Sequence, residues 1–441
     1  MNLAIVGEGV ALSYDDFDRQ VEIARAALDR FAPGTVLALR PGVDVRTAVW
    51  VMAAWQSHVT LWLMHPRVPE RELERQRAVV GAALELGALP DASSDVASLE
   101  ARRAPSERAP IDEVPFAIVF TSGTTGTPRG AVLSRRAFRI AAETSARNLG
   151  WRDDDRWLLS LPPAHVGGLS VLLRTFAARR TVVLAPPKLE VAALPTLVEA
   201  HRVTLLSLVP TVLHRLLASG WRAPSHVRAV LLGGAAASPS LLRHAREADV
   251  PVLTTYGMTE TCAQVATRAP GDTRDAPDVG TFLGGVEACV RDGVLMLRGP
   301  QLFDGYVGEP SPFDAEGWFS TGDLAHLDEA GRLTLLGRRG DLIVRGGENV
   351  YPARVEATLL EDDRIDAVSV LGLTDDEWGE RVAAALVAKD PDAALEALVT
   401  APLATFERPS RVAFFDALPT NTTGKIDRAA LRATAVWRPL D

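Results

Sequence analysis

Cysteine and lysine are scarce in this sequence. The scarcity of cysteine excludes two kinds of structural site, and the scarcity of lysine makes each lysine more informative. The 441 residues include two cysteines, Cys262 and Cys289, too few for a disulfide framework or a structural zinc site. We therefore expect two reduced thiols in a cytoplasmic protein. Only three of the 47 basic residues are lysine. Because arginine supplies nearly all the positive charge, a lysine in a chemically demanding position carries extra weight.

Long apolar runs and an excess of basic residues are also missing. No stretch reaches the roughly 18 uncharged apolar residues that span a bilayer, so no membrane span is expected. Asp15, Asp16 and Asp18 stand where a signal peptide would be basic and then apolar. The net charge of −9 offers a nucleic-acid partner no electrostatic footprint. The composition is that of a soluble globular protein.

Short β-rich runs alternate with helix-like segments over the first two-thirds of the sequence. Strands are predicted at residues 36–39, 116–120, 181–184, 203–209, 229–232 and 252–255. Helices are predicted at residues 134–149, between a capping Ser134 and Gly150, and at residues 166–178. This alternation predicts βαβ units, and therefore an α/β fold with mostly parallel sheets covered on both faces.

Later segments predict further parts. Residues 91–112, rich in Ala, Ser, Pro and charge, indicate a surface connection between subdomains. From Gly280 to about Leu336, short strands broken by glycines predict an antiparallel, barrel-like piece. A small α+β unit follows. We expect an N-terminal domain of residues 1–339 and a mobile C-terminal domain of residues 340–441, joined by a hinge.

A loop rich in glycine and hydroxyl groups follows the predicted strand 116–120. It reads Thr121-Ser-Gly-Thr-Thr-Gly-Thr-Pro-Arg129. Glycines let backbone N–H groups approach a phosphate, the hydroxyls add donors, and Arg129 adds charge. The spacing is not that of a GxxxxGK[ST] P-loop, which excludes that class of nucleotide-binding protein. Taken alone, the segment is equally compatible with a solvated turn of small polar residues.

Four further segments follow in order. They are Tyr256-Gly-Met-Thr-Glu260, Ser320-Thr-Gly-Asp323, Gly337-Arg-Arg-Gly-Asp341 and Pro419-Thr-Asn-Thr-Thr-Gly-Lys425. With the loop, they resemble the motifs of the adenylate-forming superfamily of acyl-CoA synthetases, luciferases and peptide-synthetase adenylation domains. The resemblance covers nearly the whole chain. It implies an AMP-forming ligase that binds ATP, Mg²⁺ and a carboxylic acid and forms an acyl-adenylate.

The resemblance also implies a role for each motif. Glu260 binds Mg²⁺, Thr259 helps to hold the α-phosphate, and Lys425 bridges the carboxylate and the phosphate. Asp323 accepts the ribose hydroxyls beside Arg338. The loop holds phosphates through Thr121, Ser122, Gly123, Thr124, Thr125 and Gly126, with Arg129 as the cation. The adenine pocket is formed by Gly233, Gly234, Ala235, Tyr256 and Gly257.

Two positions depart from the family pattern. Many relatives have lysine where this sequence has Arg129, although arginine can also hold phosphate oxygens. Gly340 stands at the hinge, where relatives often have Asp or Lys. Glycine absorbs large φ/ψ changes, which fits a rotation of the small domain between adenylation and thioester formation. By resemblance, Gly346, Gly347 and Glu348 line the coenzyme A channel in the second step.

The segment Leu161-Pro-Pro-Ala-His165-Val-Gly-Gly-Leu-Ser170 stands where the family lines its acyl pocket. Peptide-synthetase domains that activate α-amino acids have a Phe-Asp pair here, so Ala164-His165 offers a substrate ammonium no counter-ion. Arg174 follows on the predicted helix, and relatives carry a basic residue there. It is either a substrate contact or an ordinary surface arginine. No carrier domain follows Lys425 in this sequence, so free coenzyme A is the expected acceptor.

Among CoA ligases, two motifs most resemble those of the 2-succinylbenzoate–CoA ligases of menaquinone biosynthesis. They are Tyr256-Gly-Met-Thr-Glu-Thr-Cys-Ala-Gln264 and Gly346-Gly-Glu-Asn-Val-Tyr-Pro352. A medium-chain or aromatic acyl-CoA ligase, an adenylation domain charging a carrier protein, and a non-catalytic nucleotide-binding relative stay open. The last would be expected to lose Glu260, Asp323 or Lys425, and all three are present. Relatives often form homodimers, but the sequence carries no interface signature.

Overall fold

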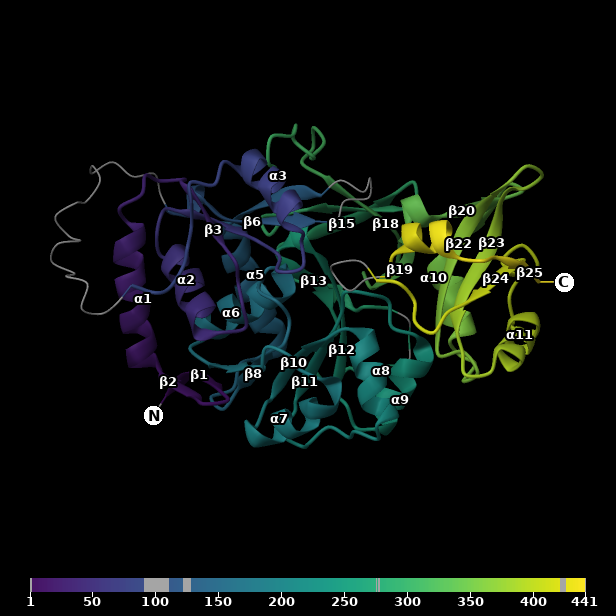
Figure 1. The fold of residues 1–441 in the computed structure, drawn as a ribbon, viewed down its shortest axis with the longest axis horizontal. Helices are drawn as coiled ribbons and strands as arrows, with labels where there is room; N and C mark the ends of the chain where they lie inside the picture. The colour runs from purple at the N-terminus through teal and green to yellow at the C-terminus, as the bar shows by residue number, and fades with distance from the viewer. Residues whose placement is uncertain are drawn as a thin grey trace.

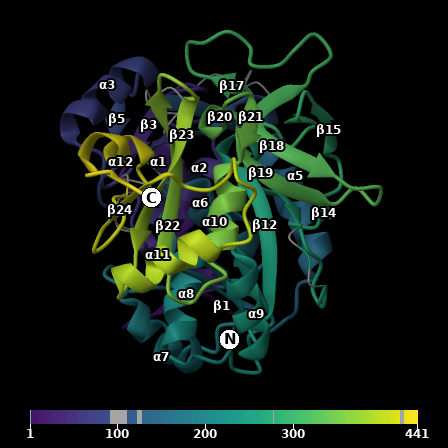
Figure 2. The ribbon, with the colours of Figure 1, turned by 90° about the vertical axis from the view of Figure 1, so that its right-hand side faces the viewer.

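The computed structural model describes residues 2–90, 111–121, 128–274, 276, 278–420 and 426–440. Figure 1 shows a large part built around two sheets and a smaller C-terminal part at one end. Figure 2 views the molecule from that end, with the C-terminal strands β22 and β23 in front of the large part. No helix in the described ranges is long and apolar enough to cross a membrane.

The first sheet has nine strands, and its central six run parallel. In spatial order the strands are β14 (Thr281–Phe282), β13 (Ala263–Thr267), β12 (Val252–Met258), β11 (Ala229–Leu232), β10 (Leu205–Leu208), β8 (Arg156–Leu159), β9 (Thr181–Leu184), β1 (Leu3–Gly7) and β2 (Val10–Ser13). Antiparallel strands close both ends of the sheet.

The second sheet has six strands and carries the glycine-rich loop. In spatial order they are β17 (Gly305–Tyr306), β7 (Arg129–Ser134), β6 (Pro115–Thr121), β4 (Thr60–Leu63), β3 (Val36–Leu39) and β5 (Leu84–Glu85). Strands β6, β4, β3 and β5 are parallel, whereas β7 and β17 are antiparallel additions.

Helices cover both faces of these sheets. Their bounds are α1 (Tyr14–Leu28), α2 (Val45–Trp55), α3 (Glu70–Val80), α5 (Arg135–Leu149), α6 (Val166–Ala177), α7 (Leu194–Ala200), α8 (Pro210–Ala218) and α9 (Pro239–Glu247). One core joins both sheets to α1, α2, α5 and α6. A second packs the nine-stranded sheet against α7, α8 and α9, and a third packs the six-stranded sheet against α3.

Strand β4 shows how the sequence builds these layers. Successive side chains of a strand point to opposite faces. Leu61 and Leu63 therefore enter the core shared by the two sheets, whereas Trp62 and Met64 enter the core under α3. Such a strand is apolar throughout, as expected of a parallel strand buried on both faces.

The predicted strands and helices are confirmed with small shifts at their ends. The predicted strand 203–209 shortens to β10, and the predicted strand 252–255 lengthens to β12. Helix α5 begins after Ser134, whose Oγ accepts a hydrogen bond from the backbone N–H of Ala137 at 3.2 Å, and ends at Gly150. The predicted connection at 91–112 lies almost wholly outside the described residues.

The predicted antiparallel piece is a four-stranded sheet. Its strands are β15 (Glu287–Arg291), β16 (Val294–Arg298), β18 (Phe319–Leu327) and β19 (Leu333–Arg338). Asp323 on β18 is the register partner of Arg338 on β19. The end of β19 leads directly into the 3₁₀ turn η4 (Arg339–Asp341), which contains Gly340.

The C-terminal part is a mixed sheet with helices and cores of its own. Its elements are β20 (Ile343–Arg345), β21 (Glu348–Val350), α10 (Pro352–Leu359), β22 (Ala367–Asp375), β23 (Gly379–Val387), α11 (Pro391–Thr400), β24 (Arg411–Phe414), α12 (Arg428–Thr434) and β25 (Arg438–Pro439). The Ser240 hydroxyl at the start of α9 donates a hydrogen bond to the Leu360 carbonyl of this part at 2.9 Å. A domain boundary between residues 339 and 340 stays a prediction.

Candidate active site

The glycine-rich loop spans the turn between β6 and β7. Thr121, the last residue of β6, pairs in register with Arg129, the first residue of β7. The two strands thus bring both ends of the loop together at one edge of the sheet. The predicted phosphate contacts Ser122, Gly123, Thr124, Thr125 and Gly126 lie outside the described residues.

Arg129 belongs to a cluster of charged and aromatic side chains. Its guanidinium lies over the ring of Tyr306, 3.5 Å from the ring centroid. Its Nε donates to both carboxylate oxygens of Glu309, at 2.9 and 3.0 Å, and this bond raises the pKa of Arg129. Strand β17, which carries Tyr306, pairs directly with β7, so backbone pairing accounts for the contact.

Glu260 joins the same cluster from the other sheet. It lies in the 3₁₀ turn η3 (Thr259–Thr261) directly after β12, and its side chain is buried. The Tyr306 hydroxyl donates to Glu260 Oε1 at 2.6 Å, and the Glu260 carbonyl accepts the backbone N–H of Phe303 at 2.9 Å. Burial and the Glu260 charge raise the pKa of Tyr306, which keeps its phenol protonated.

The chemistry of this cluster fits a magnesium ion shared with phosphates. Among the described residues no group of three or more His, Cys, Asp or Glu side chains could hold a metal ion. A single buried carboxylate next to an arginine is nevertheless what Mg²⁺ uses when substrate phosphates and water complete its shell. Glu260 is the residue that would hold it.

A second cluster surrounds Asp323. The Tyr256 hydroxyl donates to Asp323 Oδ2 at 2.5 Å, and Arg338 Nε lies 2.6 Å from Asp323 Oδ1. Burial, followed by the Asp323 charge, raises the pKa of Tyr256. Each carboxylate oxygen has two lone pairs, so Asp323 can accept ribose hydroxyls as well. The structure therefore brings Tyr256, Asp323 and Arg338 together, as the sequence predicts.

The small residues of the predicted adenine pocket follow two neighbouring strands. Gly233, Gly234 and Ala235 follow β11, and Gly234 and Ala235 are exposed. Gly257 on β12 has a clear structural reason to be glycine: a β-carbon there would lie 1.8 Å from the carbonyl oxygen of Ala263. Close pairing of β12 with β13 therefore requires it.

The two predicted acid contacts lie at opposite ends of α6. His165 is the N-cap residue, and its ring lies 4.6 Å from the ring of His65. Arg174 lies in the last turn, about two and a half turns of helix away. The structure does not bring these two side chains together through the helix, and any ligand that meets both must span that length.

Arg174 is not a surface arginine, because its side chain is only 4% exposed. Its Nη1 donates to Gln264 Oε1 at 3.1 Å, while Nε and Nη2 have no hydrogen-bond partner within the described part of the chain. Burial lowers the pKa of Arg174 to about 10. Buried polar groups are nearly always hydrogen-bonded, so these two donors are unusual.

The predicted channel residues form the turn between β20 and β21. Gly346 has φ +59°, and a β-carbon on it would lie 2.8 Å from the ring of Trp378. The Gly346 N–H donates to the Trp378 carbonyl at 2.8 Å, and Trp378 is 41% exposed. Gly347 in the same turn and Glu348, the first residue of β21, are exposed. Lys425 lies outside the described residues.

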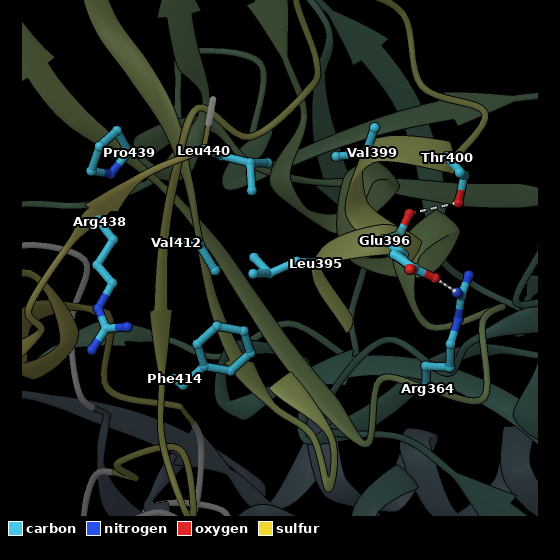
Figure 3. A pocket seen from close by; sticks show the side chains of 10 residues that line it. All are labelled: Arg364, Leu395, Glu396, Val399, Thr400, Val412, Phe414, Arg438, Pro439 and Leu440. Atoms are coloured by element: carbon cyan, nitrogen blue, oxygen red, sulfur yellow. Dashed lines mark hydrogen bonds and ion pairs between the residues drawn. The ribbon is translucent and has the colours of Figure 1, made fainter. Parts of the chain in front are cut away.

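Sequence reasoning missed Tyr306, Gln264 and Trp378. Gln264 ends the motif that begins at Tyr256, and Tyr306 is one of only four tyrosines, so both carried a weak signal. Trp378 gave none, because its contact with Gly346 depends on the pairing of β20 with β23. A surface cleft on the C-terminal part, with Arg364, Glu396 and Arg438 in its lining, holds none of the predicted site residues (Figure 3).

Most of the chain matches known protein families. Residues 2–307 match the family described as AMP-binding enzyme, and residues 354–425 match the AMP-binding enzyme C-terminal domain. The 2-succinylbenzoate–CoA ligase of Bacillus pumilus is 40% identical over 333 residues, which cover 72% of this chain and 68% of that one.

Two solved structures of o-succinylbenzoate CoA synthetase from Bacillus subtilis have the same fold. The complex with the acyl-adenylate intermediate superimposes with a TM-score of 0.85 at 30% identity, covering 98% of this chain and 95% of that one. The complex with ATP and a magnesium ion gives a TM-score of 0.84 at 29% identity, covering 98% and 96%. Motif order, fold and relatives agree, and the chain belongs to the AMP-binding enzyme family.

Proposed function

We propose that this protein is an ATP-dependent 2-succinylbenzoate–CoA ligase that acts through an acyl-adenylate. A carboxylate oxygen of the acid attacks the α-phosphorus of ATP, the bond to the β-phosphate oxygen breaks, and pyrophosphate leaves. The sulfur of coenzyme A then attacks the acyl carbon, and AMP leaves. The identity to ligases of that name, at 40% for the Bacillus pumilus enzyme, supports this assignment.

Attack on the α-phosphorus brings two anions together, so the site must supply position and positive charge. Arg129 at the base of the glycine-rich loop offers a guanidinium to the phosphates. Glu260 holds Mg²⁺, which neutralises phosphate charge when bound. Asp323 holds the ribose beside Arg338, and Lys425 bridges the acid and the phosphate. These roles are part of the proposal.

The buried Arg174 is the observation that carries the choice of acid. 2-Succinylbenzoate has a second carboxylate, which needs a cation once it is taken out of water. Arg174 offers two unpaired donor nitrogens, Nε and Nη2, in the protein interior, next to Gln264. A medium-chain or aromatic monocarboxylate would leave both groups unpaired, so the geometry favours the dicarboxylate.

The second step would use the C-terminal part. A thiol-bearing chain could approach the backbone at Gly347, where a β-carbon would meet no other atom, and Trp378 adds an exposed aromatic surface beside the turn. Rotation about Gly340 would bring this turn to the acyl-adenylate.

We expect free coenzyme A as acceptor, a cytoplasmic location and a homodimer. The homodimer can be measured by size-exclusion chromatography with light scattering.

Pyrophosphate release on a panel of acids tests the proposal. Release should be fastest with 2-succinylbenzoate and should require ATP and Mg²⁺, with the thioester appearing only after coenzyme A is added. Silence with 2-succinylbenzoate and turnover of octanoate would refute the choice of acid. Turnover of acids only with a carrier protein in place of coenzyme A would refute the acceptor.

A further inference from the structure

Tyr306 contacts both Glu260 and Arg129, the two charged residues that are proposed to hold the metal ion and the phosphates. Its hydroxyl donates to Glu260 at 2.6 Å, and its ring lies under the guanidinium of Arg129 at 3.5 Å. The two charged residues come from different sheets, Glu260 after β12 and Arg129 on β7. Tyr306, on β17, connects them, and nothing in the motif reasoning assigns it a role.

We infer that Tyr306 is a positioning residue that orients Glu260 toward the metal ion and seats Arg129 toward the phosphates. The inference rests on the proposed function, because it deepens the same site. The contacts come from both ends of one side chain, the phenol oxygen and the ring face. A residue that only filled space would need neither.

The hydroxyl fixes one carboxylate oxygen and leaves the other available. Glu260 Oε1 accepts the phenol, whereas Oε2 accepts no hydrogen bond from the described residues. The Glu260 side chain is 5% exposed, so few water molecules can replace the phenol. A ligating carboxylate held by such an outer hydrogen bond presents its free oxygen in one orientation, and loss of the outer bond commonly weakens metal affinity about 10- to 100-fold.

The ring side acts on Arg129. A guanidinium over an aromatic face is attracted by the ring quadrupole, and Glu309 fixes its rotation by accepting hydrogen bonds from both Nε and Nη2. Arg129 thereby keeps a defined plane at the base of the loop. The ring itself is held by packing against Phe303, with centroids 4.8 Å apart in an edge-on arrangement.

The substitution Tyr306→Phe removes the hydroxyl and keeps the ring, its packing and the contact with Arg129. Calorimetry of ATP binding in Mg²⁺ and in EDTA then separates the two ends of the side chain. We expect the affinity for ATP in Mg²⁺ to fall about tenfold or more, whereas the affinity in EDTA stays at the wild-type value.

Tyr14 provides a matched control. Its hydroxyl donates to the Arg180 carbonyl at 2.7 Å, and its ring carries the guanidinium of Arg179 at 4.0 Å, on a different part of the fold. Tyr14→Phe removes the same atom from a similar environment. It should leave ATP affinity unchanged in both buffers, whatever it does to the melting temperature.

The outcomes separate the inference from the proposed function. Equal ATP affinity of Tyr306→Phe and wild type in Mg²⁺, or an equal loss in Mg²⁺ and EDTA, overturns the inference alone. Wild-type protein that binds ATP no more tightly in Mg²⁺ than in EDTA overturns the role of Glu260 and the inference with it. In a Glu260→Gln background the effect of Tyr306→Phe should vanish, and an additive loss there also overturns the inference.

Discussion

We expect the substitution Arg174→Met to raise the free energy of unfolding and to lower the ligase activity. Burial lowers the pKa of Arg174 from its ordinary, higher value to about 10. At about 1.36 kcal/mol per pKa unit, the charged form costs the folded state about 3 kcal/mol. Because the folded-state pKa lies below the unfolded one, this cost is complete below pH 10 and shrinks only as the pH rises above 10.

Methionine fills much of the same volume without a charge. Gln264 Oε1 would keep the hydroxyl of Ser145 as a donor, at 3.3 Å, so few polar groups lose their partners. We expect the free energy of unfolding to rise by about 1–3 kcal/mol in the absence of ligands, measured by tryptophan fluorescence in urea. The kcat/KM for 2-succinylbenzoate should fall about 100-fold, since a buried charge pair is lost.

Arg135 is the control that makes this prediction sharp. It is 1% exposed, and burial lowers its pKa to about 10 as well. Its Nη2, however, donates to the carbonyls of Ala54, Ser57 and Val59 at 2.7, 2.6 and 2.8 Å. Arg135→Met leaves these buried carbonyls without a hydrogen-bond donor and should lower the free energy of unfolding by at least about 3 kcal/mol.

The two variants should therefore move stability in opposite directions. The reasoning is refuted if Arg174→Met lowers the free energy of unfolding by more than about 1 kcal/mol, because the guanidinium would then be satisfied in the free protein. It is also refuted if that variant keeps its kcat/KM for 2-succinylbenzoate. Calorimetry of ATP binding serves as the reference measurement, because it does not involve the second carboxylate of the acid.

Three further substitutions test other parts of the site. Gly257→Ala places a β-carbon 1.8 Å from the carbonyl oxygen of Ala263, so we expect a loss of at least about 3 kcal/mol or no soluble protein; a wild-type melting temperature would contradict this. Lys425→Ala should abolish adenylate formation, as measured by pyrophosphate exchange, and leave ATP binding largely intact. Normal exchange would show that Lys425 has no role in adenylate formation. Gly340→Pro should slow thioester formation more than adenylation in single-turnover experiments, and equal losses in both steps would argue against a hinge.

Local pattern was sufficient for those strands and helices that the sequence analysis predicts by range. The apolar run that forms β6 and the capping pair Ser134 and Gly150 are readable because a few neighbouring residues decide them. The order of strands within the sheets is not readable in this way. Strand β1 lies between β9 and β2, and the pairing of β1 with β9 joins segments far apart in the sequence.

The sequence identifies charged candidate residues, but it gives no signal of the contacts that connect them. Asp323, Arg338 and Glu260 stand in motifs whose letters identify them. The bond from Tyr306 to Glu260 depends on β17 pairing with β7, and β17 has only two residues, too short for any periodic signal. The burial of Arg174 likewise depends on β13 and α5 packing around α6, so an arginine between apolar neighbours could equally have faced water.

The hydrogen bond from Ser240 to the Leu360 carbonyl stabilises one orientation of the C-terminal part over the one proposed for the other reaction step. Turning the small part about Gly340 would separate these residues. One such bond contributes about 1 kcal/mol, which shifts a two-state population by a factor of about five. A ligand that binds one orientation more than about five times as tightly as the other would therefore reverse this preference, so the difference in ligand affinity would decide the orientation of the small part.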